Sequence, residues 1–144
     1  MSFDDEEASM RELLRDISAT ASFNRWAGFE VVRAGGGECE LRMPWRAEDM
    51  GQYGGFLHAG LIGALLDTVC GFAAVTVVPE GQSVLASQFS VNCLAVAAGD
   101  EFVATGRVVK AGRKQIFTTG ELHAVTGDDR KLVATATTLL VPTG

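Results

Sequence analysis

The sequence predicts an α+β fold in which an antiparallel sheet of five to six strands wraps around one long central helix. The first observation is a continuous apolar run over residues 57–78 that is too long for an ordinary strand. The second is a series of strand-like segments joined by short polar turns. With 144 residues and 47% hydrophobic content, the chain is expected to form a single domain over residues 1–144.

A short amphipathic helix is expected at about residues 5–18. Acidic residues at positions 4–7 lie where the positive end of a helix dipole favours them. Apolar side chains then recur at helical spacing, namely Met10, Leu13, Leu14 and Ile17. We interpret this helix as a packing element over the core.

Two strands are expected next, at residues 29–33 and 38–43, around a glycine-rich turn. Pro44 ends the second strand, because proline cannot donate a ladder hydrogen bond. The segment at residues 23–28 is expected to be a connector, and residues 45–53 a loop that leads into the central helix.

The central helix is expected at about residues 58–77. Its bulky side chains share one stripe, formed by Leu61, Leu65, Val69 and Phe72. Small residues and one acid share the other stripe, formed by Gly60, Gly63, Ala64, Asp67, Cys70, Gly71 and Ala74. Because glycine inside a helix costs about 1 kcal/mol relative to alanine, the small stripe indicates that another element comes close to it.

A membrane span is the alternative interpretation of so long an apolar run. The segment carries an acid near its centre, lacks a basic flank, and is followed by polar alternating strands. These features favour a buried helix in a water-soluble sheet.

Four further strands are expected after this helix, at residues 83–94, 101–110, 115–125 and 131–141. The turns between the last three are short and polar, which is typical of antiparallel neighbours. The remainder of the chain therefore supplies most of the sheet.

Composition excludes several partners. A net charge of -6 argues against nucleic acid and anionic membrane, since both require a basic footprint. The three cysteines lack metal-ligand spacing and are expected to be reduced packing residues, so no metal is predicted. The first residues lack the basic start and apolar core of a signal peptide, and a cytoplasmic location is expected.

Three polar residues gather around the central helix: Gln52, His58 and Asp67. His58 and Asp67 are nine residues apart, roughly 14 Å along a helix axis, and on opposite sides of it. They cannot act on one atom within one chain. If two chains pack their small stripes antiparallel across a two-fold axis, Asp67 of one approaches the helix start of the other. The pattern therefore predicts a homodimer with two shared sites.

The helix start has chemistry of its own, because its first N–H groups lack partners and carry partial positive charge. The N–H groups of Ala59 and Gly60 could polarise a carbonyl and stabilise an oxyanion. Asp67 could then act as a nucleophile or as a general base. Structural alternatives remain open: Asp67 could simply bond to a neighbour, and His58 could cap or orient the helix. Gln52 could be ordinary loop polarity.

The run Gly55-Phe56-Leu57-His58-Ala59-Gly60, with Asp67 nine positions after the histidine, resembles the motif of hotdog-fold acyl-CoA thioesterases. The resemblance is to the PaaI and 4-hydroxybenzoyl-CoA thioesterase type and covers about residues 23–141. It implies a hotdog fold, hydrolysis of an acyl- or aryl-CoA thioester, homodimers and their further association into tetramers. Coenzyme A would be part of the substrate, and no separate cofactor is implied.

The resemblance also implies roles for single residues. Asp67 matches the catalytic carboxylate, and Gln52 the polar residue six positions before the histidine. The residue after the histidine supplies the polarising N–H, and here Ala59 replaces the usual glycine. Relatives often place Ser or Thr near the catalytic water, whereas this chain has Leu85 at that position and Ser87 two residues later.

The substrate is expected to contact two further regions. Arg113 and Lys114, beside Gly112 in the turn between two late strands, could meet the phosphates of coenzyme A. Otherwise this turn is an ordinary solvated one. Phe56 is expected to contact the substrate, and the depth of the pocket depends on how Phe56, Phe72, Phe89 and the partner's side chains meet. The sequence leaves the identity of the acyl group open.

Two rival functions remain. A hotdog dehydratase acting on a carrier-bound substrate is disfavoured, because its central helix usually carries Glu or a different His/Asp arrangement. A non-catalytic acyl-CoA binding module would use the same pocket as a sensor, and only Asp67 and Gln52 favour catalysis over binding.

Overall fold

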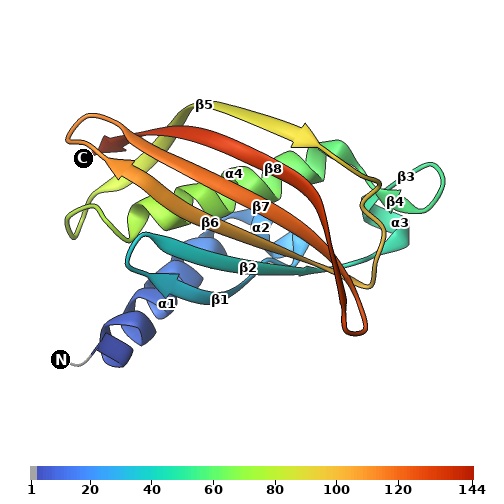
Figure 1. The fold of residues 1–144 in the computed structure, drawn as a ribbon. Helices are drawn as coiled ribbons and strands as arrows, with labels where there is room; N and C mark the ends of the chain where they lie inside the picture. Colours follow the sequence, from blue (N-terminus) through green and yellow to red (C-terminus); the bar gives the residue numbers. More distant parts are fainter. Residues whose placement is uncertain (1–2) are drawn as a thin grey trace.

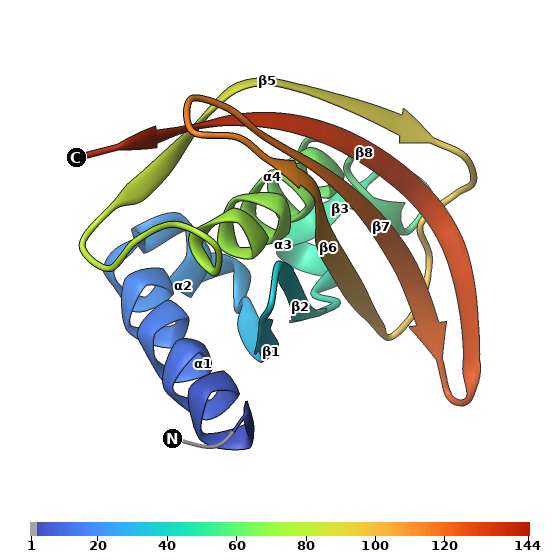
Figure 2. The same ribbon diagram turned by 60° about the vertical axis from the view of Figure 1, so that its left-hand side comes forward.

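The computed structural model describes residues 3–144 and shows a curved six-stranded sheet wrapped around the helix α4, Ala59–Val75 (Figures 1 and 2). All neighbouring strands are antiparallel, in the order β1-β2-β6-β7-β8-β5. The six strands are β1 Glu30–Gly35, β2 Glu38–Pro44, β5 Ser83–Cys93, β6 Glu101–Ala111, β7 Ile116–Thr126 and β8 Asp129–Thr143. The predicted α+β hotdog architecture is therefore confirmed.

The N-terminal helix is longer than predicted and is followed by a second one. The helix α1 spans Phe3–Thr20, and α2 spans Ser22–Ala27 where a connector was expected. Gly28 ends α2 in a left-handed conformation with φ 78, and its N–H donates to the carbonyls of Asn24 and Arg25. Six residues are too few for helical periodicity to be visible in a sequence, which explains why the connector prediction was wrong.

The expected loop at residues 45–53 is also structured. It contains the short helix α3, Ala47–Met50, and the strand β3, Gly51–Gln52. β3 pairs with β4, Phe56–Leu57, directly before α4. The chain thus enters the central helix through a small hairpin at one end of the sheet (Figure 1).

The helix α4 buries one side against the sheet and leaves the other uncovered. Its 17 residues span about 25 Å, and no helix within residues 3–144 is long and apolar enough to cross a membrane. Cys70 and Ala74 are fully buried, so their assignment to the small stripe was wrong. The uncovered face consists of Gly60, Gly63, Ala64, Asp67, Thr68 and Gly71.

Two glycines in the sheet allow α4 to lie close to it. A Cβ atom at Gly106 of β6 would be 2.7 Å from the carbonyl oxygen of Val69, and one at Gly120 of β7 would be 3.0 Å from Cys70 Sγ. These glycines are cross-strand partners, so together they form a side-chain-free patch under the middle of the helix. The close approach fixes the position of α4 on the sheet.

Candidate active site

The first turn of α4 is capped by the histidine that precedes it. His58 has an extended backbone, and its Nδ1 atom accepts a 2.8 Å hydrogen bond from the N–H of Gly60. The capping role expected of His58 is therefore present. The N–H of Gly60 is consequently engaged, so only the Ala59 N–H forms no hydrogen bond with residues 3–144. The expectation that both amides are free was wrong for Gly60.

The hairpin before α4 is tied to this helix start by backbone hydrogen bonds. The N–H of His58 donates to the Met50 carbonyl at 3.0 Å, and that of Leu57 donates to the Ala97 carbonyl at 2.9 Å. Gln52 lies opposite Phe56 in the ladder of β3 and β4. These contacts place the half-buried Gln52 beside the exposed start of the helix.

Arg46 fastens the same segment to α2. Its guanidinium donates to the carbonyls of Trp26 at 2.5 Å and Ala27 at 3.3 Å, and it forms an ion pair with Asp49 at 3.0 Å. The guanidinium carbon also lies 5.2 Å from the centroid of the Trp26 ring, a cation–π contact. No local sequence pattern predicts this role of Arg46, because its partners are backbone carbonyls and an aromatic ring that is distant in the chain.

A pocket of about 460 Å³ opens beside the helix start. Four residues predicted for the site line it, namely Gln52, Phe56, His58 and Ala59. The rest of its wall is formed by Tyr53, Leu57, Ile62 and residues 93–97, and no Asp, Glu, Lys or Arg lines it. The uncharged run after β5, at residues 93–97, is the sequence signal for this part of the wall.

Asp67 lies further along α4, outside this pocket. It is eight residues beyond Ala59, about 12 Å along the axis. Its carboxylate is half-buried on the uncovered face and forms no hydrogen bond or ion pair with residues 3–144. Burial raises the pKa of Asp67 above its ordinary value of 3.8. Within one chain, the acid and the pocket are therefore separate.

The buried thiols are poor alternatives as nucleophiles. Burial raises the pKa of Cys39 to about 12 and that of Cys70 to about 11. Neither thiol ionises appreciably near neutral pH. Cys93 was predicted to be a packing residue, but this prediction was wrong: its side chain is exposed at the edge of the pocket. Within residues 3–144, no group of three or more His, Cys, Asp or Glu side chains is arranged to hold a metal ion.

A bulge in β5 changes the expected alternation of that strand. Leu85 pairs with Val141, whereas Phe89 pairs with Thr138, and the register shifts between Ala86 and Gln88. Leu85 therefore points to the outer face of the sheet, and Phe89 points toward α4, 3.7 Å from a Cβ built at Gly63. Ser87 occupies the bulge, and its hydroxyl donates to the Leu139 carbonyl at 3.2 Å.

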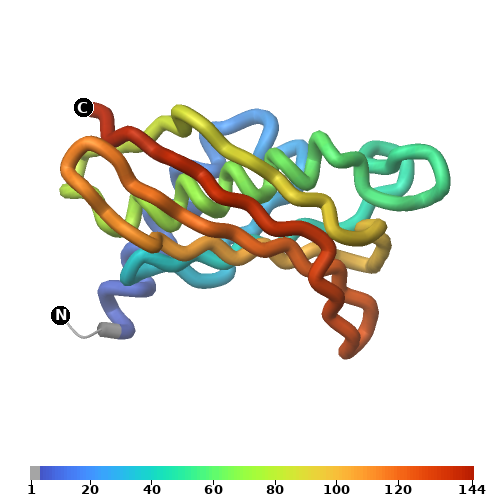
Figure 3. Tube along the Cα trace, turned by 45° about the horizontal axis from the view of Figure 1, so that its top comes forward, coloured from blue at the N-terminus to red at the C-terminus, as the bar shows by residue number. Residues whose placement is uncertain are grey.

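The basic turn lies at the end of the molecule opposite the pocket. Gly112, Arg113 and Lys114 are exposed in the turn between β6 and β7, where the Gly112 N–H donates to Gln115 O at 2.8 Å. Figures 1 and 3 show this turn beside the C-terminus, far from β3 and β4. A groove of about 610 Å³ on the outer face adjoins it and includes Lys110 and Lys114.

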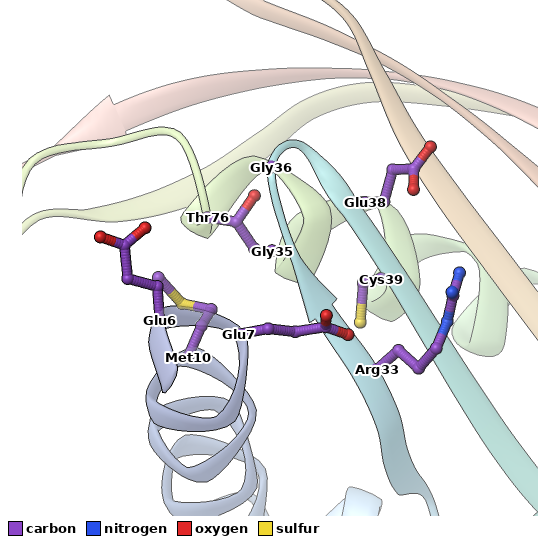
Figure 4. Close-up of a pocket in the computed structure, with 9 residues that line it drawn as sticks. All are labelled: Glu6, Glu7, Met10, Arg33, Gly35, Gly36, Glu38, Cys39 and Thr76. Atoms are coloured by element: carbon purple, nitrogen blue, oxygen red, sulfur yellow. The ribbon is translucent and has the colours of Figure 1, made fainter. Parts of the chain in front are cut away.

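Another pocket, of about 320 Å³, lies between α1 and the β1–β2 turn. Figure 4 shows Glu7 reaching across it toward Arg33, with Glu6 and Glu38 at its edges. Three carboxylates against one guanidinium give this pocket a negative field. It is therefore a poor place for an anionic ligand.

Comparisons with known proteins agree with the sequence motif. The family model described as the thioesterase superfamily matches residues 54–131. A thioesterase family protein from Silicibacter pomeroyi is 33% identical, with a TM-score of 0.86, over 90% of this chain and 94% of that chain. No curated protein matches the sequence.

Two more distant structures share the fold. The PaaI protein of the E. coli phenylacetic acid degradation operon is 20% identical, with a TM-score of 0.83 over 96% of each chain. A thioesterase from Haemophilus influenzae is 22% identical, with a TM-score of 0.79, over 91% of this chain and 90% of that chain.

The raised pKa of Asp67 predicts a pH-dependent stability difference. A carboxyl group whose pKa is raised by folding stabilises the fold at pH values below its unfolded-state pKa of 3.8. This contribution is lost as the pH rises through the folded-state pKa. We expect Asp67→Asn to have a higher free energy of unfolding than the wild type at neutral pH. Urea unfolding at several pH values should show that the difference in free energy of unfolding between the variant and the wild type shrinks as the pH falls toward 3.8. A constant difference would contradict the burial argument.

Proposed function

Because the chain belongs to the thioesterase superfamily, we propose that it hydrolyses an acyl- or aryl-CoA thioester to the free acid and coenzyme A. The observation that carries this proposal is the Ala59 amide at the exposed start of α4, which forms no hydrogen bond within residues 3–144 and lies beside Gln52 and a pocket without Asp, Glu, Lys or Arg. A CoA ester substrate also agrees with the cytoplasmic location expected from the sequence.

In the proposed reaction, the thioester carbonyl oxygen accepts a hydrogen bond from the Ala59 N–H. As a general base, the carboxylate of Asp67 removes a proton from the water whose oxygen forms the new bond to the carbonyl carbon. As a nucleophile, it attacks the carbonyl carbon itself, and water then hydrolyses the resulting anhydride, which releases the free acid and regenerates Asp67. In both routes the carbon–sulfur bond breaks, and the coenzyme A thiolate leaves and takes up a proton. The amide and the helix dipole stabilise the negative charge that develops on the carbonyl oxygen.

This mechanism requires two chains, because Asp67 lies outside the pocket of its own chain. Two features support a homodimer. The uncovered face of α4 is built from small residues, and β5 is an 11-residue edge strand with exposed apolar side chains, among them Leu85 and Phe89. Exposed, long and apolar edges are surfaces that proteins normally cover.

An antiparallel arrangement of the two α4 helices would complete the site. The pocket lies at the N-terminal end of α4, whereas the basic turn lies at the other end of the molecule (Figure 1). A two-fold axis beside α4 brings the Asp67 and the Arg113–Lys114 turn of one chain to the pocket side of its partner. Further association into tetramers is proposed from the resemblance alone.

We expect Ala59→Pro to lower kcat about 100- to 1000-fold while the fold is kept. Proline is favoured at the first position of a helix, and His58 already has the extended backbone (φ -63, ψ 136) that a residue before proline requires. The substitution therefore removes the N–H without removing a hydrogen bond of the helix. Thiol release from CoA esters measures the effect, and Ala59→Gly, which keeps the N–H, is the matched control. Equal activity of the proline and glycine variants would remove this amide from the mechanism.

Mixing two inactive variants should restore activity. If each site combines Asp67 of one chain with Ala59 of the other, a heterodimer of Asp67→Asn and Ala59→Pro contains one intact site. Refolding the variants together in equal amounts should recover about a quarter of wild-type activity, since half of the dimers are mixed.

The control is each variant refolded alone, which should stay inactive. Inactivity of the mixture, with mixed dimers confirmed by differently tagged chains, would show that the sites are not shared. A wild-type protein that binds CoA esters without releasing thiol would instead be a sensor.

The basic turn provides a test of the CoA contact. Replacing Arg113 and Lys114 by Ala should raise KM for CoA esters by several-fold, with a smaller effect for thioesters that lack the nucleotide. The difference should diminish at high salt, because both side chains are exposed. Replacing Arg130 and Lys131, an exposed basic pair in the β7–β8 region, serves as the control. An equal effect on both kinds of thioester would speak against a phosphate contact.

A further inference from the structure

The guanidinium of Arg46 joins the second N-terminal helix to the segment that leads into α4. Its Nη1 donates to the Ala27 carbonyl at 3.3 Å, and its Nη2 to the Trp26 carbonyl at 2.5 Å. Its Nε donates to Asp49 Oδ2 at 3.0 Å. All three nitrogen atoms are therefore engaged, two with α2 and one with α3. The single ammonium group of a lysine cannot reproduce this fork.

The two carbonyls belong to the last turn of α2, which ends at Ala27. The last carbonyls of a helix lack partners within the helix and carry partial negative charge, so a guanidinium there is favourable. The guanidinium carbon also lies 5.2 Å from the centroid of the Trp26 ring. The ring and the carbonyls together fix the orientation of the Arg46 side chain, which is 30% exposed.

The backbone of Arg46 continues this connection toward α4. Its carbonyl accepts hydrogen bonds from the N–H groups of Asp49 at 3.2 Å and Met50 at 3.0 Å, which places Arg46 at the N-cap of α3. Met50 is buried, and its own carbonyl accepts the N–H of His58 at 3.0 Å. Two successive backbone hydrogen bonds therefore join Arg46 to the residue that precedes the Ala59 amide.

The segment between Arg46 and His58 has little secondary structure of its own. The helix α3 has four residues, and the strands β3 and β4 have two residues each. Helices and hairpins of this size are not stable in water by themselves. The segment therefore depends on contacts with the rest of the chain, and Arg46 supplies such a contact where the segment begins.

We propose that Arg46 is a positioning residue for thioester hydrolysis, and that it acts through Met50 and His58 to keep the Ala59 N–H aimed at the substrate carbonyl. The inference rests on the proposed function and adds a residue that does not line the pocket. Displacing a catalytic group by about 1 Å can lower a rate about 100-fold. Loss of Arg46 therefore lowers kcat more than it raises KM, because the groups that contact the substrate are all still present.

The first test is the kinetics of Arg46→Gln, which removes both the charge and the fork. We expect kcat for CoA esters, measured from thiol release, to fall about tenfold, and KM to change less than about threefold. An unchanged kcat would overturn the positioning role while hydrolysis stands.

Arg15→Gln is the matched control. Arg15 also donates to a backbone carbonyl, that of Val31 at 3.2 Å, and forms an ion pair with Glu12 at 3.2 Å, but it lies on α1. Its kcat should stay within about twofold of the wild type. An equal fall in kcat in both variants would overturn the proposal, because the loss would then be a general effect of removing a structural arginine.

A double-mutant cycle tests the route through Ala59. In the Ala59→Pro background the amide donor is absent, so Arg46→Gln should lower the remaining kcat by less than about twofold. A further loss of about tenfold would show that Arg46 acts on another group and would overturn this route.

Hydrogen exchange gives a readout that does not depend on turnover. Deuterium uptake, followed by mass spectrometry, compares residues 47–58 with residues 61–75, which form most of α4. Arg46→Gln should speed exchange at residues 47–58 about tenfold, with a smaller change at residues 61–75. Arg15→Gln should leave the ratio between the two segments unchanged.

The two readouts separate this inference from the proposed function. If the wild type releases no thiol, hydrolysis fails, and exchange alone decides whether Arg46 holds the helix start. A selective rise in exchange at residues 47–58 then supports the contact, and an unchanged ratio between the segments overturns it.

A second variant covers the case in which Arg46→Gln does not fold, as judged by circular dichroism. Arg46→Lys keeps the charge and can pair with Asp49, but it cannot also bond both carbonyls of α2, so kcat should still fall about threefold. A folded Arg46→Lys variant with wild-type kcat and wild-type exchange would overturn the proposal.

Discussion

The close contact between α4 and the middle of the sheet is the constraint on which the rest of the structure depends. Gly106 and Gly120 let the helix backbone approach β6 and β7 where any side chain would prevent it. The buried side of α4 is therefore determined by backbone proximity as well as by side-chain size. Once that side is fixed, the opposite face, with Asp67, must lie outside the core.

This geometry separates the chemical groups along the molecule. The helix start, its His58 cap and the pocket occupy one end, while the basic turn occupies the other. Asp67 lies between them on a face that its own chain leaves uncovered. In the proposed mechanism, a second chain related by two-fold symmetry brings these groups together, and the small residues around Asp67 leave room for it.

The hairpin before α4 supplies several of the residues that line the pocket. Arg46 fastens its beginning to α2, and Met50 and Leu57 join it to the helix start and to the segment after β5. Between these anchors, Gly54 and Gly55 adopt positive φ and let Tyr53 contact Phe56 at the pocket. Gln52 and the two aromatic rings are thus positioned by the same short element.

The sequence by itself determined the α+β class, the long central helix and the six main strands, because apolar periodicity and turn residues are local signals. It also indicated the motif from Gln52 to Asp67, whose residue types suit carbonyl polarisation and proton transfer. Only the tertiary structure decided which face of α4 is buried: Cys70 lies against the sheet because Gly106 and Gly120 leave room for it, and Ala74 packs with Ile116 and Leu140. Likewise, the bulge that turns Leu85 away from α4 depends on pairing with β8, which is distant in the chain. Local patterns specify elements, whereas contacts between distant segments specify how those elements face one another.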